Sequence, residues 1–285
     1  MKQKILFLLL SFYSMATTAQ NFEWAKILGG PAGGTGKDIV VDATGNVYTV
    51  GDYGYNVFTG PADFDPGPAT FNFTLPQNGS ASFFSKLNSN GNFVWARSFP
   101  SISGVGGVIC RVIAFDQAGN LVVAGLFNGT ADFDLGPGIF NLTASEPFGP
   151  SPNNPLDFFV AKYTPSGNFL WAKSMPGNAL NEVYDLTVDA QNNILITGYF
   201  LGEMDADPST NTSIFFTGTS TPNLFVVKLT DVGNYIWAKQ LYDVNGSSGH
   251  AIKTDSIGQV YITGGFAAVD FDPGPGTVFV SSVGL

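Results

Sequence analysis

Four pairs of aspartates recur along this chain, and a single residue separates the two acids of each pair. The pairs are Asp63 and Asp65, Asp132 and Asp134, Asp205 and Asp207, and Asp270 and Asp272. In an extended segment, side chains two residues apart point to the same side, so two such carboxylates lie close together. Ca²⁺ takes six to eight oxygen ligands, and a following glycine, at 67, 136 and 274, lets backbone carbonyls turn inward. These eight aspartates are therefore the candidate metal site, with calcium as the candidate cofactor.

A purely structural role is the other interpretation of the pairs. A complete calcium loop has a third acid near its fifth position, which these segments lack, and the third copy carries Ser209 where the others have glycine. Aspartates next to a rigid Pro-Gly turn can instead cap backbone N–H groups. Catalysis by the pairs is not expected, because a motif repeated in every unit does not create one asymmetric site. The sequence leaves calcium and capping both open.

Other reactive residue types are few. His250 is the only histidine and precedes an apolar strand, where we expect a loop or core role, and Cys110 is the only cysteine and lies in an apolar run. No Gly-x-Ser-x-Gly elbow accompanies His250, and no cluster of His and Cys exists for zinc. A glycosidase would need two non-repeating carboxylates, for which Glu182 and Glu203 are the off-pattern acids. We therefore predict no catalytic residue.

The segments that position these residues repeat about every 70 residues, with one tryptophan in each copy. Each unit opens with an apolar strand ending in aspartate, then a turn rich in Gly and Asn, then a second strand ending in glycine. The aspartate pair follows in a longer connection, and a second hairpin ends in a Trp-Ala-Lys or Trp-Ala-Arg strand. The strand-ending aspartates are Asp42, Asp116, Asp189 and Asp255, and the tryptophans are Trp24, Trp95, Trp171 and Trp237. Lysines at one position of the third strand, Lys86, Lys162 and Lys228, are expected to be solvated or paired with the strand-ending aspartates.

Four strands in two hairpins cannot bury both faces of a sheet, so neighbouring units must stack. Radial stacking of four-stranded sheets gives a β-propeller, whereas the alternative, a parallel β-helix, normally uses shorter coils. We predict an all-β fold with units at about 38–97, 110–173, 183–239 and 249–285, and a lone outer strand at 22–28. That amounts to three complete blades and a partial one, an incomplete or truncated ring. The missing blades would come from the rest of the chain or from another chain.

Two segments carry a resemblance to a known repeat. They are Val41-Asp42 with Gly45-Asn46, Tyr48 and Gly51, and Phe158-Phe159-Val160 with Lys162, Gly167-Asn168 and Trp171-Ala172-Lys173. With their copies, these segments resemble the bacterial β-propeller repeat called the SBBP repeat, over essentially everything after Gln20. The Asp-Phe-Asp-Pro-Gly connections resemble those of large secreted bacterial proteins exported by the type IX route, although this chain shows no C-terminal sorting domain. The resemblance implies first strands innermost and Trp strands outermost.

The start of the chain and its charge bear on location and partners. Lys2, Lys4, an apolar run over 5–13 and small residues before Gln20 predict a signal peptide at 1–19, too short to span a membrane. The net charge of -10 disfavours nucleic acid as a partner. We expect a secreted or outer-surface propeller at 20–285, a non-enzymatic binding or structural module for protein or glycan. Its ligand would lie on the face with the long connections. The alternative is a polysaccharide-active enzyme with a site at the propeller axis.

Overall fold

The computed structural model describes residues 22–54, 61–74, 81–99, 107–145, 156–217, 221–243, 245–272 and 276–281. The predicted signal peptide lies outside these residues, as do Gly274 and most of the connection at 143–155. Within the described ranges every regular element is a strand except one 3-10 turn, η1 (Gly30–Ala32). None of the described residues forms a helix long and apolar enough to cross a membrane.

Three antiparallel sheets have four strands each. Blade 1 contains β1 (Gly34–Val41), β2 (Val47–Tyr53), β5 (Ala81–Leu87) and β6 (Phe93–Ser98) in that spatial order. Blade 2 contains β7 (Gly107–Phe115), β8 (Leu121–Asn128), β11 (Asp157–Tyr163) and β12 (Phe169–Met175). Blade 3 contains β13 (Asn181–Val188), β14 (Ile194–Phe200), β17 (Asn223–Leu229) and β18 (Tyr235–Leu241). Blade 4 consists of β19 (Ser247–Thr254) and β20 (Val260–Phe266), which pair with each other.

A short two-stranded ribbon follows the second strand of every blade. The four ribbons are β3 (Ala62–Asp63) with β4 (Asn72–Phe73), β9 (Thr130–Asp132) with β10 (Asn141–Thr143), β15 (Glu203–Asp205) with β16 (Ile214–Phe216), and β21 (Ala268–Asp270) with β22 (Phe279–Ser281). The first strand of each ribbon ends on the first aspartate of a pair. The aspartate pairs are thus held at one end of the blades, where the second strand leads to the third.

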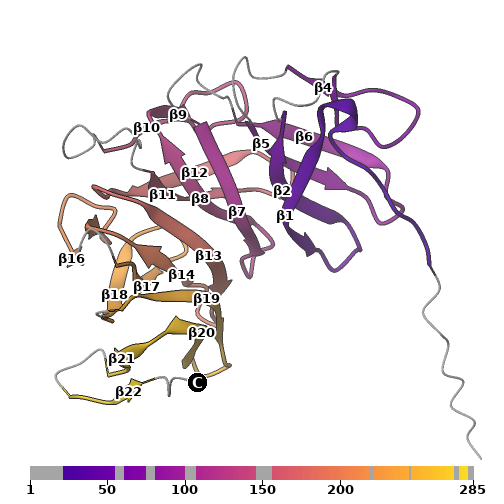
Figure 1. Ribbon diagram of the computed structural model, residues 1–285. Helices are drawn as coiled ribbons and strands as arrows, with labels where there is room; N and C mark the ends of the chain where they lie inside the picture. Colours follow the sequence, from indigo (N-terminus) through magenta and orange to yellow (C-terminus); the bar gives the residue numbers. More distant parts are fainter. Residues whose placement is uncertain are drawn as a thin grey trace, which may run out of the picture.

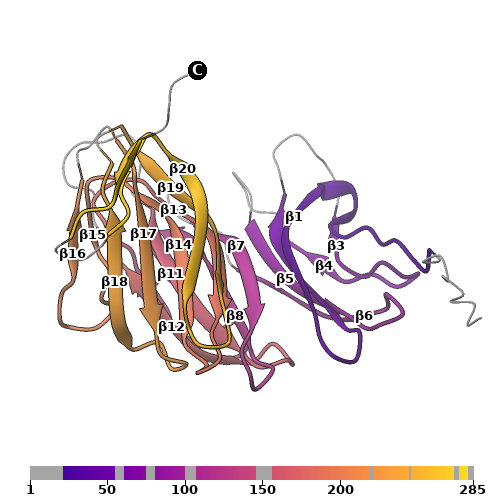
Figure 2. The ribbon, with the colours of Figure 1, turned by 90° about the horizontal axis from the view of Figure 1, so that it is seen from below.

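The blades stand side by side along an arc, with blade 1 at one end and blade 4 at the other (Figure 1). The first strands β1, β7, β13 and β19 line the inner side of the arc and contact one another in sequence. Blades 2 and 3 stack face to face (Figure 2) around a shared apolar cluster. These features confirm the predicted β-propeller of four-stranded blades with a partial fourth blade, and the described residues form an arc rather than a closed ring.

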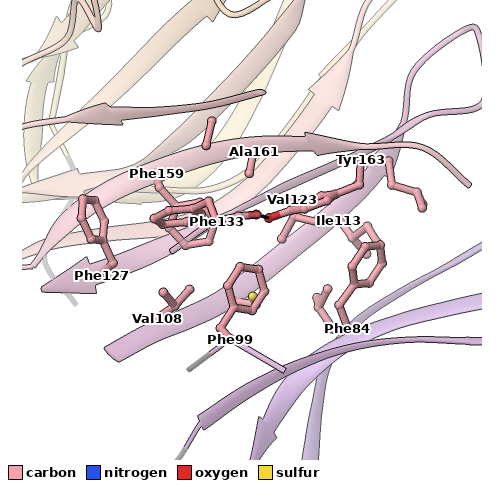
Figure 3. Close-up of a cluster of buried hydrophobic side chains, with 14 of the residues drawn as sticks. Phe84, Phe99, Val108, Ile113, Val123, Phe127, Phe133, Phe159, Ala161 and Tyr163 are labelled. Carbon is pink, nitrogen blue, oxygen red and sulfur yellow. Dashed lines mark hydrogen bonds between the residues drawn. The ribbon is translucent and has the colours of Figure 1, made fainter. Parts of the chain in front are cut away.

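The third strands of blades 2 and 3 are apolar on both faces because a blade lies on either side of them. Phe159 faces blade 1 and joins the cluster that contains Phe84 and Phe99 (Figure 3), whereas its neighbour Val160 faces blade 3. Phe133, the middle residue of an Asp-Phe-Asp motif, is fully buried in the same cluster, 4.8 Å from Phe159 between ring centroids. The motif therefore combines two turn-capping acids with one side chain that fills the blade interior.

The predicted strand at 22–28 is not formed. This segment has no regular structure, because within the described residues no strand offers it a ladder of backbone hydrogen bonds. Its tryptophan is nevertheless placed like those of the outer strands. Trp24 packs on Gly91 of blade 1 and donates its Nε1–H to the carbonyl of Ser89 at 3.1 Å, and Trp171 of blade 2 does the same with Gly233 and Asp231 of blade 3, at 3.2 Å.

Candidate functional site

The first aspartate of each pair caps its own connection. Asp63 Oδ1 accepts the backbone N–H of Asp65 at 3.0 Å and that of Phe71 at 2.8 Å. The other first aspartates accept equivalent pairs of N–H groups: Asp132 from Asp134 and Phe140, Asp205 from Asp207 and Ser213, and Asp270 from Asp272 and Val278. These bonds close the turn between the two ribbon strands in all four units.

The second aspartates cap the next turn. Asp65 and Asp134 accept the N–H of Gly67 and Gly136 through Oδ1, and Asp207 accepts that of Ser209 at 2.9 Å. Serine replaces glycine here without loss because the bond uses only a backbone N–H. Two neighbouring carboxylates need positive charge close to them, and here the N–H dipoles supply it at the place where Ca²⁺ is predicted. Among the described residues no group of three or more His, Cys, Asp or Glu side chains could hold a metal ion. Calcium at the eight aspartates stays a prediction.

The strand-ending aspartates hold the hairpin turns and bind the recurring lysines. Lys162 Nζ lies 2.6 Å from Asp116 Oδ2, and Lys228 Nζ lies 2.7 Å from Asp189 Oδ2, which confirms the predicted pairing at these two positions. Burial alone would raise the pKa of Asp116, but the hydrogen bonds from Lys162 and Asn120 outweigh it and hold that pKa below its usual range. These pairs stabilise the blade interior rather than forming a site.

A β-bulge interrupts every inner strand at the same place. The extra residue lies between Gly36 and Asp38 in β1, and the pairing registers put it at the equivalent point in the other inner strands, so that the bulged residues are Lys37, Arg111, Tyr184 and His250. The bulge brings an inner-strand carbonyl against the glycine that recurs on the second strand. A Cβ on Gly125, for example, would collide with the carbonyl oxygen of Ile109. The second strand therefore needs glycine at Gly51, Gly125, Gly198 and Gly264.

Three of the bulged residues belong to one group of polar and aromatic side chains on the inner side of the arc. Arg111 binds both carboxylate oxygens of Glu182 in the next blade through one edge of its guanidinium, with Nε–Oε1 at 2.7 Å and Nη2–Oε2 at 3.0 Å. Tyr184 meets His250 of blade 4 edge to face, with 5.1 Å between ring centroids, and Tyr199 at 5.8 Å. We call these five residues the inner-strand cluster. It bridges blades 2, 3 and 4.

The cluster is open to solvent and rich in donors. His250 is exposed, Tyr184 is 42% exposed, and Arg111 and Glu182 are half-buried. Burial first and the Glu182 carboxylate second raise the pKa of the Tyr184 hydroxyl, which therefore stays protonated at neutral pH. The bulges lie in the half of each inner strand that is nearer the connection between the second and third strands. In blade 1, for example, the bulge is opposite Gly51, which is close to the end of β2, where this connection begins. A ligand on that face would meet this cluster.

The sequence identified the aspartates correctly as recurring elements but missed the cluster. His250 lies in β19 with its side chain exposed, so the expected loop or core role is wrong. Glu182 is held by Arg111, and Glu203 opens the ribbon strand β15 opposite Phe216, so the structure gives these two acids different surroundings. One signal in the sequence could have found it. The bulge position of the repeat carries a different polar or aromatic residue in each unit, namely Lys, Arg, Tyr and His.

Comparison with known proteins supports the architecture. No protein-family model matches the chain. In an alignment of 231 positions that covers 75% of the chain, the sequence is 26% identical to a WD repeat-containing protein of Acanthamoeba polyphaga mimivirus, itself uncharacterised. The chain spans only 16% of the length of that protein. This similarity to a WD repeat protein agrees with a β-propeller built from repeats.

Proposed function

We propose that this protein is a non-enzymatic binding module, in which the propeller presents the inner-strand cluster to a protein or glycan partner. The observation that carries the proposal is the contrast between a framework that repeats and a bulge position that does not. The capping aspartates, buried lysines and close-packed glycines recur from blade to blade, whereas the bulged residue differs in each of the four. A surface that must recognise one partner needs such an unrepeated set of side chains on rigid strands.

The chemistry of the cluster suits recognition. Tyrosine and arginine are over-represented among the residues that contribute most to binding, because they combine contact area with directed hydrogen bonds. Tyr184 offers an exposed ring, and the Arg111–Glu182 pair offers fixed donors and acceptors beside it. Both oxygens of Glu182 lie on the guanidinium, which fixes the carboxylate in place. This arrangement supports binding more directly than the alternative of polysaccharide cleavage, which needs a second carboxylate placed across the bond.

We place the protein outside the cell, secreted or on the outer surface, as a bacterial propeller of the SBBP kind exported by the type IX route. The signal-peptide pattern of residues 1–19 and the Asp-Phe-Asp-Pro-Gly connections support this placement. We also propose that further residues of the polypeptide, or another chain, supply the remaining strands of blade 4 and further blades.

Binding by the cluster can be tested with purified protein on immobilised glycans and on a panel of purified extracellular proteins. For any ligand found, Tyr184→Ala and Arg111→Ala should weaken binding at least about tenfold, or about 1.4 kcal/mol. Tyr242→Ala is the matched control, because Tyr242 is 59% exposed and directly follows the outer strand β18. Binding that survives both cluster substitutions, or falls equally in the control, would overturn the proposed site.

A further inference from the structure

We infer that the free edge of β20 and the hollow beside it are a docking site for a β-hairpin of the same type as the third and fourth strands of blades 1 to 3. Its first strand would carry Phe, Lys and an apolar or aromatic residue at its third, sixth and seventh positions, as β5, β11 and β17 do, and its turn would carry glycine. The inference rests on the proposed completion of blade 4, and the other three blades define what the hairpin must contain.

The pairing register defines the first strand. β2, β8 and β14 each lie between two partners, whereas β20 pairs with β19. The recurring glycine of the second strand faces a phenylalanine each time: Gly51 faces Phe83, Gly125 faces Phe159 and Gly198 faces Phe225. Three positions further along the third strand, a lysine faces Tyr48, Val122 or Leu195. The equivalent residues of β20 are Gly264 and Tyr261, which therefore call for Phe and Lys in an antiparallel partner.

Two aromatic rings of blade 4 show that a phenylalanine cover is needed. Phe127 and Phe133 of blade 2 meet edge to face at 5.5 Å, and both are fully buried because Phe159 lies against them. The equivalent rings of blade 4, Phe266 and Phe271, have the same geometry at 5.0 Å but are 41% and 40% exposed. A phenylalanine opposite Gly264 would bury them in the same way.

The hollow has room and lining for such a strand. It has a volume of about 490 Å³ and is bounded by Leu224, Val226, Trp237 and Leu241 of blade 3, with Val260 and Ile262 of β20 opposite. At the boundary between blades 2 and 3 the same space is filled, and Phe225 stacks on Phe158 at 5.2 Å. Leu224 occupies in blade 3 the strand position that Phe158 occupies in blade 2. It would therefore receive the incoming phenylalanine.

Asp255 supplies the partner for the lysine. Its Oδ1 accepts the N–H groups of Ile257 and Gln259, and its Oδ2 accepts the Tyr261 hydroxyl at 3.2 Å. Blade 1 has the same arrangement around Asp42 and Tyr48, with the ammonium of Lys86 over the Tyr48 ring, 4.8 Å from its centroid. A lysine opposite Tyr261 would reach the equivalent place, next to the Asp255 carboxylate.

Trp237 marks where the turn of the hairpin belongs. Added Cβ atoms on Gly91, Gly167 and Gly233 would come within 2.9, 3.3 and 2.9 Å of Trp24, Trp95 and Trp171, so each tryptophan of one repeat packs on a turn glycine of the next. Trp237 lines the hollow, and no turn glycine of a following blade packs on it among the described residues. A hairpin with a glycine turn would continue this series of contacts.

The probe is a synthetic peptide of residues 222–241, the chain's own third and fourth strands from blade 3, added to the full chain. At saturation, amide hydrogen exchange over 260–266 should slow at least about tenfold, and exchange in blade 2 should stay the same. The same peptide with Phe225→Ser and Lys228→Glu should bind at least about tenfold more weakly. The protein with Asp255→Asn should lose most of its preference for a peptide with lysine at position 228 over one with glutamate there.

Three results would overturn the inference. The first is that exchange over 260–266 stays unchanged at millimolar peptide, and the second is that the two peptides bind equally well. The third is that β20 is already protected without peptide and that the protein sediments as a dimer. The last result would mean that a second copy covers the edge. Because the protein with Tyr184→Ala should still bind the peptide, a failure here is separable from a failure of the proposed ligand site.

Discussion

At the scale of single residues, the recurring glycines of the second strand decide whether a blade can form. Gly51, Gly125, Gly198 and Gly264 each lie where the bulged inner strand brings a backbone carbonyl into the space of a Cβ atom. Backbone cannot yield in the way a flexible side chain can, so a methyl group there must displace a strand. The bulge that creates the proposed binding surface is thus possible only because the opposite residue has no side chain.

Gly125→Ala should lower the free energy of unfolding by more than about 3 kcal/mol, because the new methyl group meets the Ile109 carbonyl in the middle of blade 2. Gly107→Ala is the control, since a Cβ at this strand residue meets nothing within 4 Å and should change stability by less than about 1 kcal/mol. Denaturant unfolding measures both. Equal effects of the two substitutions would contradict the close-packing argument.

The buried lysine–aspartate pairs make stability depend on pH. The pKa of Asp116 is lowered in the folded state, so its contribution is present above the unfolded pKa near 3.9 and is lost as pH falls through the lower folded pKa. Lys162→Met leaves a buried carboxylate unpaired and should lower the Tm by roughly 5–10 °C at pH 7. The difference from the wild type should shrink as pH falls through the lowered folded pKa of Asp116, because the carboxyl then takes up a proton. Lys253→Met should change little, because the side chain of Lys253 is 70% exposed against 6% for Lys162.

At the scale of elements, the repeated pattern predicts where the strands lie. It does not predict which side chains of neighbouring blades contact each other. The hairpins and the blade order follow from four copies of one pattern, such as Asp116 through Gly125. The first strands begin earlier than predicted, at Gly34 rather than Asp38, because the bulge extends pairing beyond the apolar run. The bulge has no fixed residue type, so Arg111 and Glu182 gave no local signal that they meet. Only the stacking of two blades brings them together.

The connections between the second and third strands give the test for calcium. Every first aspartate already accepts two N–H groups through one oxygen, so capping alone predicts no change of Tm between calcium and chelator. Asp63→Asn keeps one acceptor oxygen and should cost little, whereas Asp63→Ala leaves the Asp65 and Phe71 N–H groups without this partner and should cost roughly 1–3 kcal/mol. A calcium-dependent rise in Tm that Asp63→Asn and Asp65→Asn abolish would instead establish the metal site.

At the scale of the whole molecule, the arc should open from its two-stranded end. In a stacked repeat, each blade is stabilised by its own sheet and by its neighbours. Among the described residues, blade 4 has half a sheet and packs against blade 3 on one side. β8 of blade 2 is buried along nearly its whole length, whereas most of β20 is exposed. Native-state hydrogen exchange should therefore show a gradient, with amides of β19 and β20 exchanging through local opening and those of β8 and β11 only through global unfolding. A destabilising substitution in blade 2, such as Gly125→Ala, should bring the two sets of opening free energies closer together. Equal protection of β20 and β8 in the protein alone would contradict this order and would mean that the edge of blade 4 is already covered.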